Sequence, residues 1–143
     1  MSAALVHHLH QHPPKALLLD LDGVFYCLAE QPILKNYDAA LEAYLIQHHG
    51  FNPIDAKTQR LAWYHQYGNT AGGARLELGV DATAMSDFAI QSIDYSVLQP
   101  CPQLRALLTA LAARVTLHIA TNAHEAHAEN VLQRLGLSDL IPV

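Results

Sequence analysis

The stretch Ala16-Leu-Leu-Leu-Asp-Leu-Asp-Gly-Val-Phe-Tyr26 is the most informative part of the sequence for the fold. Residues 16–21 form a short apolar run with prolines before it and a glycine after it, which predicts a strand buried on both faces of a parallel sheet. Two carboxylates, Asp20 and Asp22, stand at the carboxyl end of this strand. Ligands of open α/β sheets bind at that end, so the stretch predicts both an element and the position of a site.

The two carboxylates lie two residues apart, and Gly23 directly after them allows the chain to turn sharply. Neighbouring carboxylates repel each other, and a divalent cation such as Mg²⁺ that bridges them and a phosphate keeps the first one ionised. The alternative is that both acids cap the following turn. The apolar strand before the pair and the glycine after it favour a site, with Asp20 and Asp22 as the candidate Mg²⁺ ligands.

Apolar periodicity, capping residues and glycine or proline breaks predict the rest of the chain. They indicate helices over 36–49 (with Asn36 as the N-cap), over 53–67, over 81–91, from Pro102 past Leu111 and over 124–135, a loop running into a short helix over 68–79, and a strand over 115–119. The order predicts an α/β core, residues 16–26 and 101–143, interrupted by a helical insertion, residues 27–100. Residues 1–15 are predicted to be a flexible tail.

The composition of the chain limits the kinds of partner that we expect it to bind. The chain has 143 residues and a formal net charge of −5, with 8 Lys and Arg and no basic run, which argues against a nucleic-acid binder. No apolar stretch reaches the roughly 20 residues of a membrane span, and the first residues do not resemble a signal peptide. We therefore expect a cytoplasmic protein with a small-molecule partner.

Two motifs in the sequence resemble the haloacid dehalogenase superfamily. Asp20-Leu-Asp-Gly-Val-Phe-Tyr26 resembles motif I of that superfamily, and Ile119-Ala-Thr-Asn-Ala123 resembles motif II. Residues 63–73, 93–100 and 121–137 are similar to pyrimidine 5′-nucleotidases within it. The resemblance covers nearly everything after residue 16, and it implies a Rossmann-like core with a parallel sheet and an inserted α-helical cap.

The resemblance also implies a reaction and the residues that perform it. Asp20 would attack phosphorus to form an aspartyl phosphate, and Asp22 would protonate the leaving oxygen and then activate water. Gly23, the Thr121 hydroxyl and the backbone amide of Asn122 would bind the phosphoryl group. The implied activity is Mg²⁺-dependent hydrolysis of a phosphate ester, a pyrimidine nucleoside 5′-monophosphate.

The cap implied by the resemblance selects the leaving group. Tyr67 and Thr70 are the candidate substrate-binding residues on it, by ring stacking and hydrogen bonding. For Trp63 and Tyr64 we favour packing within the cap over contact with substrate. His124 and His127 are interpreted as part of a solvated helix start rather than as metal ligands.

The sequence also departs from the superfamily pattern. The Lys of motif III and the acids of motif IV have no counterpart after Thr121, so the chain is expected to be C-terminally truncated. This leaves an alternative function: an inactive remnant or an interaction module. In that case the strand over 16–21 has an open apolar edge, and we expect self-association through it.

Overall fold

The protein is a mixed α/β structure, described by a computed structural model for His7, residues 11–27 and residues 33–141. Its elements in these residues are β1 (Ala16–Leu19), α2 (Ile33–His49), α3 (Pro53–Tyr67), α4 (Thr70–Leu78), α5 (Ala82–Gln91), the 3₁₀ turn η1 (Tyr95–Val97), α6 (Pro102–Ala112), β2 (Thr116–Ile119) and α7 (Glu125–Leu135). The mixed α/β class predicted from the sequence is therefore confirmed.

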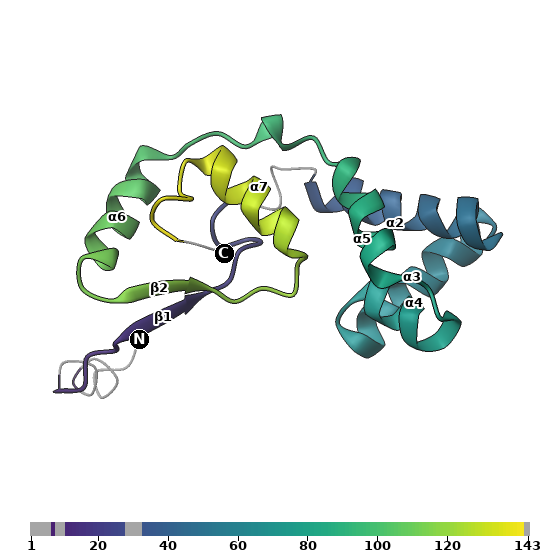
Figure 1. The fold of residues 1–143 in the computed structure, drawn as a ribbon, viewed down its shortest axis with the longest axis horizontal. Helices are drawn as coiled ribbons and strands as arrows, with labels where there is room; N and C mark the ends of the chain where they lie inside the picture. The colour runs from purple at the N-terminus through teal and green to yellow at the C-terminus, as the bar shows by residue number, and fades with distance from the viewer. Residues whose placement is uncertain (1–6, 8–10, 28–32, 142–143) are drawn as a thin grey trace.

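The described residues form two lobes with separate hydrophobic cores (Figure 1). The sheet lobe comprises β1, β2, α6 and α7, and its core includes Leu117, Val131 and Leu132. The helical lobe comprises α2 to α5, and Trp63 and Met85 are fully buried in its core. The segment that contains η1 connects α5 to α6 and so joins the lobes.

The sheet consists of β1 and β2 paired in parallel. The register places Leu17 opposite Leu117 and Leu19 opposite Ile119. One further bond, from the Ala120 amide to the Leu19 carbonyl (2.9 Å), extends the pairing to the carboxyl end of both strands. The residues that follow Leu19 and Ala120 therefore leave the sheet side by side.

The prediction that β1 is buried on both faces is wrong for the described chain. Leu17 and Leu19 pack on the sheet-lobe core, but Leu18 between them is 73% exposed. Its neighbour across the ladder, His118, is also exposed. Helices α6 and α7 lie on one side of the sheet (Figure 1), so alternate residues face solvent.

Most predicted helix ends are confirmed by their caps. Asn52 is the N-cap of α3 and accepts hydrogen bonds from the amides of Ile54 and Asp55 (both 3.0 Å), with Pro53 at the first helical position. Asp81 caps α5 in the same way. The predicted short helix after a loop is α4, with Asn69 as its N-cap.

Two predicted boundaries are wrong. Helix α2 begins at Ile33, so Asn36 lies inside the helix and does not cap it. Ile33 is fully buried in the sheet-lobe core, and this packing adds a turn that the local capping signal did not indicate. Strand β1 ends at Leu19 rather than at residue 21, because the chain turns away from the ladder after Asp20.

The boundary between the two hydrophobic cores does not coincide with the ends of the predicted helical insertion. Ile33, Ile93, Tyr95 and Leu98 fall within residues 27–100, but they pack in the sheet-lobe core. The ends of the helical segment are therefore anchored to the sheet lobe. Most of the predicted tail, residues 1–6 and 8–10, lies outside the described residues.

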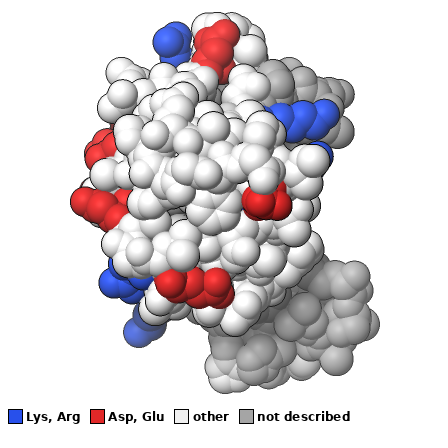
Figure 2. All heavy atoms as spheres, turned by 90° about the vertical axis from the view of Figure 1, so that its right-hand side faces the viewer, with Lys and Arg blue, Asp and Glu red and all other residues white. Residues whose placement is uncertain are grey.

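The surface of the helical lobe carries scattered charge. Figure 2 shows this end of the molecule, where acidic and basic side chains stand in isolated groups separated by uncharged surface. No basic patch is visible on this face. Among the described helices, none combines the length and the apolar character needed to cross a membrane.

Gly73 allows α3 and α4 to approach closely, since a Cβ on it would lie 2.5 Å from Trp63 Cβ. We predict that Gly73→Ala lowers the free energy of unfolding by about 1–3 kcal/mol, because the helices must separate. The matched control is Gly72→Ala, whose Cβ would meet nothing nearer than Asn69 Oδ1 at 3.6 Å. Urea unfolding of both variants measures the difference; equal stabilities would contradict this packing.

Candidate functional site

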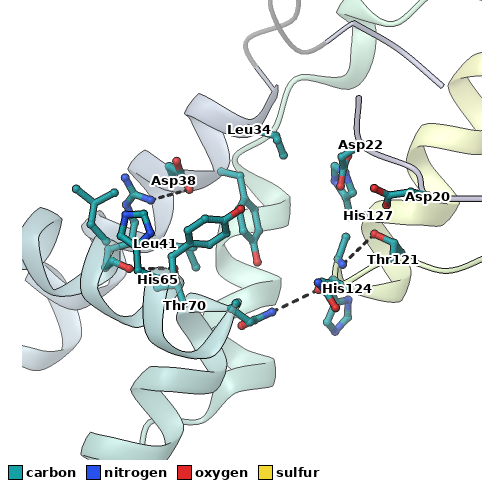
Figure 3. Close-up of a pocket in the computed structure, with 18 residues that line it drawn as sticks. Asp20, Asp22, Leu34, Asp38, Leu41, His65, Thr70, Thr121, His124 and His127 are labelled. Carbon is teal, nitrogen blue, oxygen red and sulfur yellow. Dashed lines mark hydrogen bonds and ion pairs between the residues drawn. The ribbon is translucent and has the colours of Figure 1, made fainter. Parts of the chain in front are cut away.

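A cavity of about 510 Å³ lies between the two lobes. Figure 3 shows Asp20, Asp22 and Thr121 on its sheet side and Asp38, His65 and Thr70 on its helical side. The full lining is Asp20, Asp22, Leu34, Tyr37, Asp38, Leu41, Arg60, Leu61, Tyr64, His65, Gly68, Asn69, Thr70, Thr121, Asn122, Ala123, His124 and His127. The lining thus combines the ends of both strands with residues from α2, α3 and α4.

Four residues predicted from the sequence meet on the sheet side. Asp20 and Asp22 follow β1, Thr121 and Asn122 follow β2, and all four line the cavity. Asp20 is exposed, and its Oδ1 accepts a hydrogen bond from the Leu21 amide (2.8 Å). The parallel register brings these two segments together although about a hundred residues separate them in the chain.

Gly23 forms the turn that follows the acid pair. Its φ of 81° is in the left-handed region, and the amides of Val24 and Phe25 both bond to the Leu21 carbonyl. Gly23 does not itself line the cavity. The sharp turn predicted at this glycine is confirmed, and it sets Asp22 against the residues of α7.

Asp22 is held by two side chains that the sequence analysis did not assign to the site. The Tyr26 hydroxyl and His127 Nε2 (3.0 Å) both donate to Asp22 Oδ1. His127 Nδ1 lies 2.9 Å from the Tyr95 hydroxyl, which donates to it in the neutral tautomer. Asp22, His127 and Tyr95 therefore form a chain of hydrogen bonds that runs from the cavity wall into the sheet-lobe core.

The interpretation of His127 as a solvated residue is wrong. Its exposed fraction is 3%, because it lies on the face of α7 that also carries Val131 and Leu135. That helical spacing was the signal available in the sequence. His124 is half-buried and caps α7, its Nδ1 accepting from the Ala126 amide (3.3 Å).

The electrostatics of the chain favour an ionised Asp22. Burial acts to raise the pKa of the Asp22 carboxyl, but hydrogen bonds from His127 and Tyr26 outweigh it, and the net pKa lies below its usual value. Burial and the Asp22 carboxylate raise the pKa of Tyr26. Burial raises the pKa of Tyr95 to about 12. Both tyrosines therefore keep their protons at neutral pH and act as donors.

On the helical side, a buried arginine is paired with two acids. Arg60 Nη1 lies 3.1 Å from Asp38 Oδ1, and Arg60 Nε lies 2.8 Å from Glu42 Oε1. Asp38 is partly exposed to the cavity. Burial raises the pKa of the Asp38 carboxyl, although the charge of Arg60 opposes the shift. The positive charge of Arg60 is therefore balanced within the helical lobe.

The aromatic residues of α3 divide between core and cavity. Trp63 is 1% exposed in the helical-lobe core, which confirms its predicted packing role. Tyr64 is 56% exposed and lines the cavity, so the prediction that it packs within the helical lobe is wrong. The two residues are adjacent, and a helix turns adjacent side chains onto different faces.

The two candidate substrate-binding residues have different surroundings. Thr70 lines the cavity, and its hydroxyl donates to the Arg60 carbonyl (3.4 Å). Tyr67 does not line the cavity; its hydroxyl donates to Glu77 Oε1 (3.0 Å). The structure therefore brings Thr70, and not Tyr67, to the predicted site.

The two lobes touch across the cavity through polar groups. Asn69 Nδ2 donates to the Asn122 carbonyl (3.4 Å), which joins the start of α4 to the segment after β2. His124 Nε2 lies 3.8 Å from Asp87 Oδ1 on α5. These contacts place the helical lobe directly over the strand ends.

The carboxylates of the site could supply only part of the ligand set of a magnesium ion. Among the described residues, no group of three or more Asp, Glu, His or Cys side chains is placed to hold a metal. Mg²⁺ in enzymes is often bound by one or two carboxylates, together with waters and substrate phosphates. Asp20 and Asp22, which both line the cavity, are the carboxylates at the strand ends that could contribute to such a shell.

No model of a known protein family matches the chain. Functional assignment therefore rests on the chemistry of the cavity and on the motifs that line it.

The lowered pKa of Asp22 predicts a pH-dependent contribution to folding. A carboxyl with a depressed pKa stabilises the fold above its unfolded pKa of about 4, and this contribution is lost as the pH falls through the folded value. We predict that wild type exceeds Asp22→Asn in unfolding free energy by about 1–3 kcal/mol at pH 7. The difference should shrink below pH about 4. Urea unfolding from pH 7 to pH 2.5 tests this; a constant difference would contradict the assignment.

Proposed function

We propose that the chain is a phosphatase of the haloacid dehalogenase type, with an α/β core and a helical cap, that hydrolyses nucleoside 5′-monophosphates. One observation carries the proposal: Asp20, Asp22, Thr121 and Asn122 come from two distant motifs and line a single cavity under a helical lobe. A carboxylate nucleophile, a second carboxylate and hydroxyl or amide donors are the groups that aspartyl-phosphate chemistry requires.

Asp20 is suited to the role of nucleophile. It is exposed at the end of β1, where its carboxylate reaches the cavity. In the first step an Asp20 oxygen bonds to phosphorus as the bond from phosphorus to the leaving oxygen breaks, and the leaving oxygen takes a proton from Asp22. In the second step water attacks phosphorus, Asp22 takes the water proton, and phosphate leaves Asp20.

Asp22 is suited to alternate between acid and base. Both hydrogen bonds that we find on Asp22 within the described chain end on Oδ1, so Oδ2 is the oxygen that would carry the transferred proton. The lowered pKa keeps the free carboxyl ionised, which is the state that can accept the water proton. A phosphate dianion arriving beside it raises the pKa of Asp22, which suits the acid step.

Thr121 and Asn122 are suited to bind the phosphoryl oxygens. Thr121 Oγ1 accepts a hydrogen bond from the Ala123 amide (3.1 Å), which orients its hydroxyl proton for donation elsewhere. Donors fixed in advance where charge sits are a main catalytic device in phosphoryl transfer. Thr121 and the Asn122 amide would play this part.

The negative charge of the site favours binding of a cation together with the substrate. A phosphate dianion next to Asp20 and Asp22 is repelled, and in the described lining no Lys or Arg stands at the sheet side. Mg²⁺ coordinated by the Asp20 carboxylate and lying beside Asp22 would neutralise this charge when bound. We therefore propose Mg²⁺ as the cofactor.

The test is Mg²⁺-dependent phosphate release from UMP and CMP. We predict that Asp20→Asn abolishes release, because the nucleophile is lost, and that Asp22→Asn lowers kcat by about 10²–10⁴-fold. The matched control is Asp55→Asn, since Asp55 is exposed on α3 and outside the cavity. Release that is independent of Asp20, or no release from either nucleotide, would contradict the proposal.

A second candidate function is an interaction module. The observation that favours it is the two-stranded sheet of the described residues, in which β1 pairs only with β2 and Leu18 is 73% exposed. Unpaired strand edges promote association between chains. We propose that a second copy of the chain pairs with the open edge of β1.

We predict that size-exclusion chromatography with light scattering finds a dimer and that Leu18→Lys converts it to a monomer, because a lysine on an edge strand disfavours pairing with another chain. The control is Leu76→Lys, since Leu76 is similarly exposed but lies on α4 in the helical lobe. A stable wild-type monomer would overturn this second candidate.

A further inference from the structure

The helical side of the cavity is lined largely by one face of α3. Residues Arg60, Leu61, Tyr64 and His65 recur at the spacing of one face of α3 and line the cavity together. Tyr64 and His65 form an aromatic pair, with ring centroids 5.9 Å apart and planes at 69°. This face lies opposite the strand-end acids, where the leaving group of a phosphate ester would sit (Figure 3).

Tyr64 is the exposed aromatic residue of this face. A large ring that is 56% exposed in a cavity, next to a tryptophan that is buried, offers an open surface for a flat ligand group. Leu61 beside it is also partly exposed. Stacking of a base on an aromatic ring contributes substantially to nucleotide binding and depends little on base identity.

The charges of the cavity oppose a second anion. Its described lining contains three carboxylates, Asp20, Asp22 and Asp38, and no Lys. Its one lining Arg, Arg60, is buried and already paired with Asp38 and Glu42. An additional phosphate or carboxylate on the leaving group would therefore meet negative charge without a cation to balance it.

Asp38 also offers a specific contact. Its carboxylate is partly exposed in the cavity, and a carboxylate accepts hydrogen bonds from the N–H and O–H groups of a heterocycle or sugar. The pairing with Arg60 holds it in place. A neutral ring with donor groups thus matches both Tyr64 and Asp38.

We propose that Tyr64 and Asp38 determine the specificity of the site, selecting a phosphate monoester whose leaving group carries a planar ring, is rich in hydrogen-bond donors and lacks a second anion. This inference rests on the proposed phosphatase function and names the residues that select its substrate. Tyr64 stacks on the ring, and Asp38 accepts its donors and repels anionic leaving groups. Nucleoside monophosphates satisfy these conditions, whereas nucleoside diphosphates and base-free sugar phosphates do not.

The experiment compares kcat/KM for three substrates: CMP, ribose 5-phosphate, which lacks the base, and CDP, whose leaving group carries a phosphate. Wild type should prefer CMP to ribose 5-phosphate by about 10-fold or more. Tyr64→Ala should reduce that preference to about 2-fold, and Tyr64→Phe should retain it, since the ring remains. Tyr67→Ala is the matched control, because Tyr67 is on the same helix but outside the cavity.

Asp38→Asn tests the charge argument separately. With Asp38 neutral, the Arg60 charge is matched by Glu42 alone, so the rate for CDP relative to CMP should rise at least about 5-fold. The inference would be overturned if Asp38→Asn left the ratio of kcat/KM for CDP to that for CMP unchanged. It would also be overturned if Tyr64→Ala left the preference for CMP over ribose 5-phosphate unchanged. Neither outcome would contradict hydrolysis itself.

A binding measurement separates this inference from the proposed function. Calorimetry with CMP on the Asp20→Asn chain, with and without Tyr64→Ala, measures binding at the site without turnover. Binding that weakens about 10-fold on loss of the Tyr64 ring supports the inference even if no variant releases phosphate. If CMP does not bind, or binds equally well without the ring, the inference fails.

Discussion

The parallel pairing of β1 with β2 is the constraint on which the candidate site depends. Its register, Leu19 opposite Ile119, extended by the bond from the Ala120 amide to the Leu19 carbonyl, fixes where both chains leave the sheet. A shift of one residue would turn every side chain of a strand to the other face. The acids after β1 and the donors after β2 meet only because this register is kept.

A second set of contacts holds Asp22. Its carboxylate is hydrogen-bonded to His127 of α7, and His127 is hydrogen-bonded to Tyr95 of η1, so the segment after β1 is tied to α7 directly and to η1 through His127. Because His127 is buried on the face of α7 that packs on the sheet-lobe core, the position of Asp22 depends on packing in that core. The chemistry of the site and the stability of the sheet lobe are therefore linked.

The sequence predicted the helices, strands and turns better than it predicted which side chains are buried. Local signals, such as Asn52-Pro53 and the glycine after Asp22, predicted helix starts and the turn because capping and left-handed geometry depend on few residues. Exposure depends on distant packing. The open face at Leu18, the buried His127 and the exposed Tyr64 were for this reason all assigned wrongly. The meeting of Asp20 with Thr121 was expected from the resemblance, whereas the approach of Asp38 and Arg60 depends on the helical lobe and had no local signal.

We propose that the Asp20 carboxylate and the Thr121 hydroxyl together form one phosphoryl site. A crystal structure of the chain grown with Mg²⁺ and beryllium fluoride, which mimics a phosphoryl group on an aspartate, tests this most directly. We expect beryllium fluoride attached to an Asp20 oxygen, within hydrogen-bonding distance of Thr121 Oγ1, with Asp22 still hydrogen-bonded to His127. An unmodified Asp20, or beryllium fluoride bound elsewhere, would contradict it.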